Sequence, residues 1–160
     1  MKPEIELVEF GPEHFDHLIE WSPTAEFLLQ WAGPSLRFPL DHAQLQDLRE
    51  GPDRLYTVTE AGRIVGHAEI GRIDADSGTG WLMRILIGNP ADRGRGLGRA
   101  IVADLVQVAF EELGLKRLYL HVLESNEPAI ALYRSLGFEK CDPVLPRPES
   151  VQAMVLERAG

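Results

Sequence analysis

Cysteine and long apolar runs are nearly absent from the sequence, and each shortage excludes a class of protein. Cys141 is the single cysteine among 160 residues, so no disulfide can form within the chain. We therefore expect a reducing, cytoplasmic compartment. No apolar run approaches the roughly 20 residues that a membrane-spanning helix needs. Residues 1–10 lack the apolar core of a signal peptide, and we expect no membrane partner.

Positive charge is also scarce, and it is concentrated. The chain has 25 acidic and 16 basic residues, which gives a formal net charge of −9. Because contacts with many phosphates need a basic surface, we expect no nucleic-acid partner. Arginines nevertheless cluster at Arg93, Arg95 and Arg99. A basic cluster on an acidic chain favours a small anionic ligand over a polyanion.

The pattern of apolar residues predicts a mixed α/β (α+β) fold. Strands are predicted at residues 5–8, 55–60, 63–73, 81–87, 117–123, 138–144 and 151–156, and helices at 14–20, 24–30, 40–50, 96–113 and 126–137. Strands 81–87 and 117–123 are joined by the longest helix in a βαβ unit, so they should run parallel. We expect a mostly antiparallel sheet that contains this one parallel pair and is flanked by about four helices.

One segment carries a phosphate-binding pattern. The run Arg93-Gly94-Arg95-Gly96-Leu97-Gly98-Arg99 lies between a buried strand and the longest helix. Glycines let backbone N–H groups turn toward one point, the helix N-terminus adds unpaired donors, and arginine adds charge. Together these features predict a pyrophosphate site. A tight turn with solvated arginines explains the same residues, so the segment alone leaves both interpretations open.

Two common phosphate loops do not match this segment. A Walker loop ends in Gly-Lys-Ser/Thr, and the segment contains no lysine. A dinucleotide fingerprint needs a third glycine where Arg99 stands and an acid about 20 residues later, where Leu118 stands. A nucleotide-binding module of either kind is therefore disfavoured.

A second pattern follows, and the two together resemble a known family. Arg93-x-x-Gly96-x-Gly98 resembles the acetyl-CoA signature of the GNAT superfamily of N-acetyltransferases. The family's second motif is similar to Asn126-x-x-Ala129-x-x-Leu132-Tyr133-x-x-x-Gly137-Phe138. The resemblance is strong over roughly residues 81–138 and weaker toward both ends. It implies a single N-acetyltransferase domain over residues 1–160 with a GNAT-like fold.

The resemblance also implies a cofactor and a reaction. Acetyl-CoA would lie in a V between the two parallel strands, and a primary amine of a small molecule or a peptide N-terminus would attack the thioester directly in a ternary complex. The implied cofactor-binding residues are Ile85, Leu86, Ile87, Arg93 to Arg99, Asn126, Ala129 and Tyr133. No metal is expected, since His14-x-x-His17 lacks the spacing of a zinc motif.

The resemblance assigns the general acid to one residue and leaves the general base open. Tyr133 matches the family tyrosine that protonates the leaving thiolate, and at helical spacing it could also be core. The base that deprotonates the amine is open between His121, Glu69 and a chain of waters. Trp31 and Phe38 are our candidates for the acceptor cleft, and the acidic composition favours a cationic amine.

Three functions are compatible with these motifs. The first is an active N-acetyltransferase, which the presence of Tyr133 favours. The second is a non-catalytic acyl-CoA-binding or sensor module that would keep the glycine and arginine segment. The third is the nucleotide-binding module disfavoured above. We expect a monomer or a homodimer.

Overall fold

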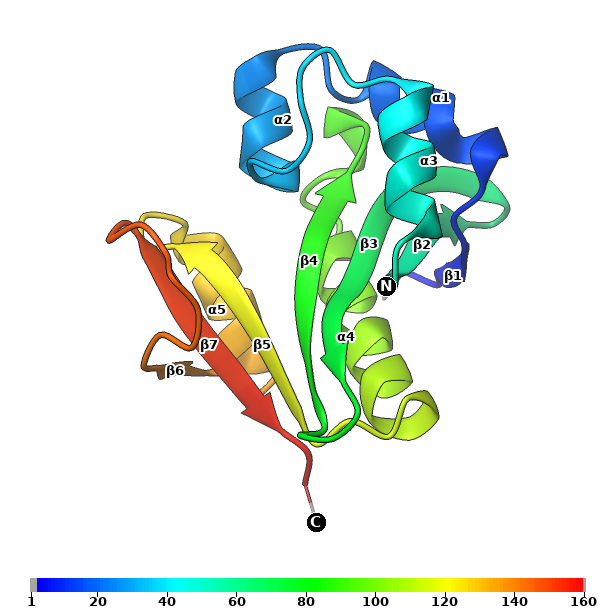
Figure 1. Cartoon of the computed structure of the whole chain (residues 1–160). Helices are drawn as coiled ribbons and strands as arrows, with labels where there is room; N and C mark the ends of the chain where they lie inside the picture. Colours follow the sequence, from blue (N-terminus) through cyan, green and yellow to red (C-terminus); the bar gives the residue numbers. More distant parts are fainter. Residues whose placement is uncertain (1–2, 160) are drawn as a thin grey trace.

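The computed structural model describes residues 3–159, which build one mixed sheet with helices on both faces (Figure 1). The strand order is β1-β2-β3-β4-β5-β7-β6, and only β4 and β5 pair in parallel. The strands are β1 (Glu6–Glu9), β2 (Arg54–Glu60), β3 (Arg63–Asp74), β4 (Thr79–Ile87), β5 (Arg117–Leu123), β6 (Glu139–Cys141) and β7 (Val151–Glu157). The predicted fold class and the βαβ unit are confirmed.

Among residues 3–159, five α-helices flank the sheet, each within or overlapping one of the five predicted ranges, where about four flanking helices were expected. They are α1 (Phe15–Glu20), α2 (Ala25–Ala32), α3 (His42–Glu50), α4 (Leu97–Gln107) and α5 (Glu127–Ser135). The shorter helical segments are η1 (Pro12–His14), η2 (Pro90–Asp92) and η3 (Val108–Glu112), the last a π-helical turn that continues α4. Within residues 3–159, no helix has the length and apolarity to cross a membrane.

Two hydrophobic clusters hold the helices against opposite faces of the sheet. Buried residues of α4, among them Leu97, Ile101 and Leu105, pack with alternate residues of β5 such as Leu118 and Leu120. This agrees with the apolar stripe of the longest predicted helix. Helices α1, α2 and α3 form the second cluster on the other face, over the end of β4.

The parallel pair separates soon after it begins. Pairing of β4 with β5 joins only Thr79–Trp81 to residues 117–119. Beyond it, β4 stays paired with β3 and β5 stays paired with β7. Each strand therefore follows its other neighbour, and a V opens between them (Figure 1). The splayed pair that the resemblance implied is present.

The upper part of β4 contains a bulge. Between the pairs His67↔Leu86 and Glu69↔Met83, β4 has one residue more than β3. Arg84 lies in the bulge with a φ of +47°, a left-handed conformation that side chains other than glycine seldom adopt. The bulge redirects the backbone of β4 beside the V. Nothing in the run of residues 81–87 indicated it.

Candidate active site

The backbone at the end of β4 faces the V. Gly88 N–H donates to Val65 O on β3 at 2.9 Å. Because backbone groups alternate in direction along a strand, those of Ile87 point toward β5. The Ile87 carbonyl accepts a hydrogen bond from Arg93 Nη2 at 3.2 Å. An extended ligand in the V could therefore pair with β4 as an added strand would.

The side chains of residues 85–87 on β4 pack against the hydrophobic clusters. Ile85 and Ile87 contact the cluster under α4, whereas Leu86 is buried in the cluster under α1, α2 and α3. A cofactor contact at Ile87 can thus be made by its backbone, whereas the backbone of Leu86 points toward β3, and the predicted contacts at Ile85 and Leu86 stay predictions.

The glycine segment between η2 and α4 adopts the backbone form that a phosphate site needs. Gly94 has a φ of +77°, and Gly96, the N-cap of α4, has a φ of +83°. A Cβ at Gly94 would meet no heavy atom within 4 Å, and one at Gly96 would meet only Pro3, at 3.7 Å. The segment therefore has open space beside it, and the first turn of α4 presents unpaired N–H groups. These features fit the pyrophosphate of acetyl-CoA.

Among the three arginines of the segment, Arg95 forms ion pairs within the protein. Arg95 pairs with Glu60 at 2.9 Å and with Asp92 at 3.1 Å. Arg63 also donates to both oxygens of Asp92, each at 2.9 Å. Hydrogen bonds from Arg63, and next from Arg95, lower the pKa of Asp92. Arg95 therefore anchors the glycine segment to the β2–β3 hairpin, a role that the sequence did not reveal.

Arg93 and Arg99 keep their charge available. Arg93 lies over the ring of Phe27 at 5.7 Å from its centroid, and Arg99 donates to the hydroxyl of Ser135 on α5. Within residues 3–159, neither forms an ion pair with a carboxylate. Their charges are therefore free to meet an anionic ligand.

An open groove of about 1050 Å³ is lined by residues 3–6, by residues 59–62 of the β2–β3 hairpin, and by Gly94 and Arg95 of the glycine segment. Three carboxylates line it, from Glu4, Glu6 and Glu60. This excess of negative charge makes it a poor site for a phosphorylated ligand. The pyrophosphate site at the first turn of α4 stays a prediction.

Helix α5 brings two predicted residues to the opposite side of the V. Tyr133 is half-buried, packs edge-on against Phe138 at 5.8 Å, and has a pKa raised by burial. The phenol therefore keeps its proton at neutral pH. Asn126 caps the helix as predicted, since its side-chain oxygen accepts from Ala129 N–H at 3.2 Å. The Asn126 amide nitrogen is left to act as a donor.

His121 lies on β5 just beyond the last parallel pair. Its ring meets Trp81 edge-on, with centroids 4.8 Å apart, and Trp81 also stacks on Tyr119 at 5.2 Å. Partial burial lowers the pKa of His121 below the usual 6.5, and the charges of Arg147 and Arg72 lower it further. The imidazole is therefore neutral at pH 7, which is the form that accepts a proton.

Glu69 is completely buried and bound on both oxygens. Arg84 Nη1 donates to one oxygen at 2.8 Å, and His67 Nε2 lies 2.7 Å from the other. Arg84 also donates to Ala32 O at 3.0 Å and to the hydroxyl of Ser35. The Glu69 carboxylate thus holds the side chain of the β4 bulge, which in turn contacts α2. Its role as a base stays a prediction, and the two hydrogen bonds count against it.

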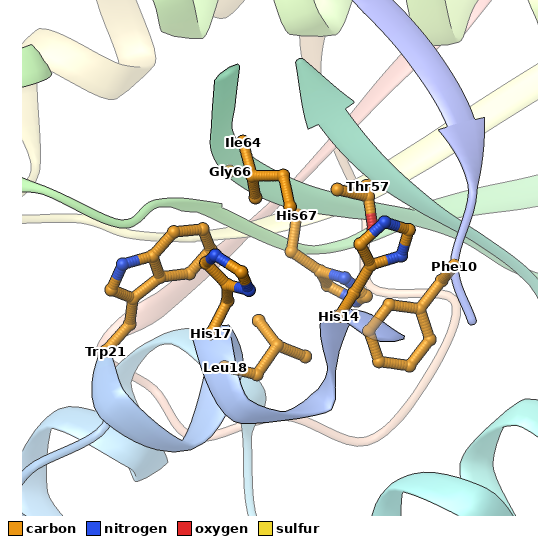
Figure 2. A pocket seen from close by; sticks show the side chains of 9 residues that line it. All are labelled: Phe10, His14, His17, Leu18, Trp21, Thr57, Ile64, Gly66 and His67. Carbon is orange, nitrogen blue, oxygen red and sulfur yellow. The ribbon is translucent and has the colours of Figure 1, made fainter. Parts of the chain in front are cut away.

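His67 borders a narrow pocket beneath α1 that has no room for a water molecule (Figure 2). His14, His17 and Thr57 also line this pocket. Burial is the main cause that lowers the pKa of His14. Among residues 3–159, the structure has no group of three or more His, Cys, Asp or Glu side chains suited to a metal ion. This histidine cluster is thus part of the packing behind Glu69.

The two residues predicted to contact the acceptor differ in exposure. Trp31 is half-buried beside His67 and donates its Nε1–H to Ser22 Oγ at 3.0 Å. Phe38 is 46% exposed, in the segment between α2 and α3. Trp31 packs against the cluster formed by α1, α2 and α3. The role of the two residues in acceptor binding stays a prediction.

Comparisons with known proteins agree with this geometry. A sequence model described as the acetyltransferase (GNAT) family matches residues 15–138. N-alpha-acetyltransferase RimI of Mycobacterium tuberculosis (strain ATCC 25618 / H37Rv) is 35% identical over 79 residues, which cover 49% of this chain and 48% of that protein. An uncharacterised protein of Mycobacterium leprae (strain TN) is 40% identical over 80 residues, which cover 50% of this chain and 21% of that protein.

A solved structure matches nearly the whole chain. Spermidine N-acetyltransferase from Vibrio cholerae in complex with CoA and spermine aligns with a TM-score of 0.74 and 21% identity, covering 98% of this chain and 95% of that one. At this identity the similarity shows the fold. The chain matches less than half the length of the two mycobacterial relatives.

Proposed function

This chain belongs to the acetyltransferase (GNAT) family, and we propose that it moves an acetyl group from acetyl-CoA to a primary amine on a small molecule or a peptide. The observation that carries the proposal is the glycine segment at the N-terminus of α4, placed at the open end of the V between β4 and β5. Acetyl-CoA supplies an activated acetyl thioester when bound.

The residues that would bind acetyl-CoA come from three elements. Arg93, Arg99 and the first N–H groups of α4 would bind the pyrophosphate, while Arg95 holds the segment in place. The backbone at Ile87 would pair with the extended arm of the cofactor. Asn126 and Ala129 at the start of α5 would line the other side. Backbone donors and arginine side chains suit this ligand because both are fixed before it arrives.

The residues that would handle protons flank the V. His121 would take a proton from the acceptor ammonium, either directly or through water, so that the neutral amine can attack the thioester carbon. A backbone N–H of β4 would donate to the carbonyl oxygen as negative charge develops on it. Tyr133 would donate its phenolic proton to the sulfur as the carbon–sulfur bond breaks, and the second proton that the nitrogen loses as the amide forms would restore the phenol. The proton held by His121 then returns to solvent.

A thermal-shift and turnover experiment tests this function. At a ligand concentration about 100 times Kd, binding adds about 2.7 kcal/mol, which shifts the Tm by several degrees. We expect a shift with acetyl-CoA and CoA, none with ATP or NAD, and release of CoA with at least one amine of a broad panel. A shift without turnover on any amine would instead indicate an acyl-CoA-binding module. If neither acetyl-CoA nor CoA raised the Tm, the proposal would be contradicted.

The pH dependence of turnover separates the two candidate bases. The pKa of His121 lies below 6.5, so its basic form predominates above that pH. We expect kcat/KM to be level above pH 6.5 and to fall, by about tenfold per pH unit, once the pH drops below the pKa of His121. His121→Ala should lose this inflexion, whereas Glu69→Gln should keep it. An inflexion that survives in His121→Ala and disappears in Glu69→Gln would assign the base to Glu69.

A further inference from the structure

The side chain of Arg84 joins β4 to α2, which lies over the end of that strand (Figure 1). Its Nε donates to the carbonyl oxygen of Ala32, the last residue of α2, at 3.0 Å, and its Nη2 donates to the hydroxyl of Ser35. Ser35 belongs to the segment of residues 33–41, which we call the α2–α3 segment. The third donor, Nη1, lies 2.8 Å from Glu69 Oε1 on β3. Because the guanidinium group is planar and rigid, it fixes these three partners relative to one another.

Glu69 determines the orientation of this guanidinium group. The side chain of Glu69 is completely buried, and that of Arg84 is only 8% exposed. His67 Nε2 lies 2.7 Å from the second oxygen of Glu69, so both carboxylate oxygens are engaged. Removing one partner of a buried ion pair leaves the other charge unpaired, which is strongly unfavourable. The ion pair is therefore held in one arrangement behind β4.

The backbone of Arg84 is strained at the same place. Its φ of +47° lies in the left-handed region, within the bulge between Met83 and Leu86. A residue other than glycine keeps this conformation only where the surrounding contacts hold it, and such strain is concentrated at functional sites. The bulge lies past Trp81, the last residue of β4 that pairs with β5. It is therefore at the open part of the V, where the proposed function places the thioester.

The α2–α3 segment is held from its other side by α3. Gln44 Oε1 accepts the N–H of Arg37 at 2.7 Å, and Gln44 Nε2 donates to Arg37 O and Pro39 O, each at 3.1 Å. Phe38 lies between these contacts and is 46% exposed. Gln44 thus fixes the later part of the segment to α3, while the guanidinium group fixes the earlier part to β4. The placement of Phe38 relative to β4 therefore depends on Arg84.

Building on the proposed function, we propose that Arg84 is a positioning residue for acetyl transfer, with Glu69 as its support. The backbone of Arg84 is part of the bulge that directs an N–H group of β4 toward the thioester carbonyl oxygen. Its side chain holds the α2–α3 segment, which contacts the acceptor amine. One residue thus sets the distance between the two reactants without reacting with either. A misplacement of about 1 Å between reacting groups costs about 100-fold in rate.

This role of Glu69 differs from that of a general base. A base needs an oxygen within hydrogen-bond reach of the amine, directly or through one water. Both oxygens of Glu69 are engaged by protein groups, and the side chain has no exposed surface. Glu69 therefore acts on the reaction through Arg84.

Arg84→Lys tests the geometry of the contacts, because lysine keeps the charge beside Glu69 but lacks the planar fork of donors. We expect kcat to fall about 10- to 100-fold and KM for the acceptor to rise at least about threefold, while Kd for acetyl-CoA stays within about threefold. Arg117→Lys is the matched control, since Arg117 pairs with Glu157 at 2.8 Å at the closed end of the V. It should change none of these values. Wild-type kcat and KM in Arg84→Lys would overturn the inference and leave the proposed function intact.

Ser35→Ala removes one of the three contacts at an exposed position, where the fold tolerates the change. We expect KM for the acceptor to rise about three- to tenfold, with kcat within about twofold of the wild-type value. The effect should be smaller in the Arg84→Lys background, because the same contact is already lost there. Additive effects of the two substitutions would show that Ser35 acts independently of Arg84, against the proposed coupling.

Glu69→Gln separates positioning from proton transfer. Glutamine keeps an oxygen that Arg84 can bind but loses the negative charge. We expect kcat to fall about tenfold at every pH, with the inflexion at low pH unchanged. If the inflexion disappeared instead, Glu69 would be the base, and its assignment as the support of Arg84 would be wrong.

Amide hydrogen exchange tests the same contacts without turnover. We expect exchange in the α2–α3 segment to be about tenfold faster in Ser35→Ala and Arg84→Lys than in the wild type, and unchanged in Arg117→Lys. Absence of turnover by the wild type on every amine would contradict the proposed function, but this comparison would still decide whether Arg84 holds the segment. Unchanged exchange in both variants, or faster exchange across the whole chain, would overturn the inference even if amines are acetylated.

Discussion

Tyr133→Phe is expected to lower kcat by about 100- to 10,000-fold, because a positioned general acid contributes that much to a proton transfer. Tyr133 is half-buried on α5, and burial raises its pKa, so the phenol is protonated and ready to donate at neutral pH. Phenylalanine keeps the packing against Phe138 and removes only the proton donor. The affinity for acetyl-CoA, measured by thermal shift or calorimetry, should therefore stay unchanged.

A second tyrosine provides the control. Tyr56 on β2 is also partly buried, with a pKa raised by burial, and it lies two strands away from the V. Tyr56→Phe should leave kcat within about twofold of the wild-type value. If Tyr133→Phe retained full turnover, Tyr133 would have a packing role alone, and the leaving thiolate would take its proton from elsewhere.

Gly96→Ala is expected to weaken acetyl-CoA binding by about ten- to a hundredfold. Gly96 is the N-cap of α4 with a φ of +83°, and alanine is strained in that conformation. Relief of the strain would rotate the N–H groups that face the pyrophosphate. Loss of one or two hydrogen bonds to a charged group corresponds to about 1.5–3 kcal/mol, which is the stated loss of affinity.

Gly114→Ala separates strain from ligand contact. Gly114 has a φ of +67° and follows the π-helical turn at the far end of α4, and a Cβ added to it would meet no heavy atom within 4 Å. Both variants should lose a similar free energy of unfolding, on the order of 1 kcal/mol. Only Gly96→Ala should raise the Kd for acetyl-CoA. Equal Kd values in the two variants would exclude the glycine segment as the phosphate site.

Local signals in the sequence were sufficient for most elements. Strand β5 was predicted with the bounds observed, and Asn126 caps α5 as expected. The β2–β3 hairpin turns at Ala61 and Gly62, which both have positive φ values. These features depend on residues only a few positions apart, so periodicity, turn residues and helix caps identify them.

The contacts that shape the site join residues that are far apart in the sequence. Asp92 meets Arg63 across 29 positions of the chain, and Arg84 meets Glu69 across 15. The bulge at Arg84 interrupts a run of residues that is typical of a regular strand. Such pairings depend on strand register, and no local pattern determines which charged side chains face each other.

The sequence by itself determined the family, the βαβ unit and the glycine segment at the start of α4, because each depends on residues close together along the chain. Only the tertiary structure decided that Arg95 anchors this segment, that Glu69 is bound on both oxygens, and that the ring of His121 packs against Trp81. The physical reason is that a side chain's charge and hydrogen bonds acquire a function only from the partners that folding brings to it.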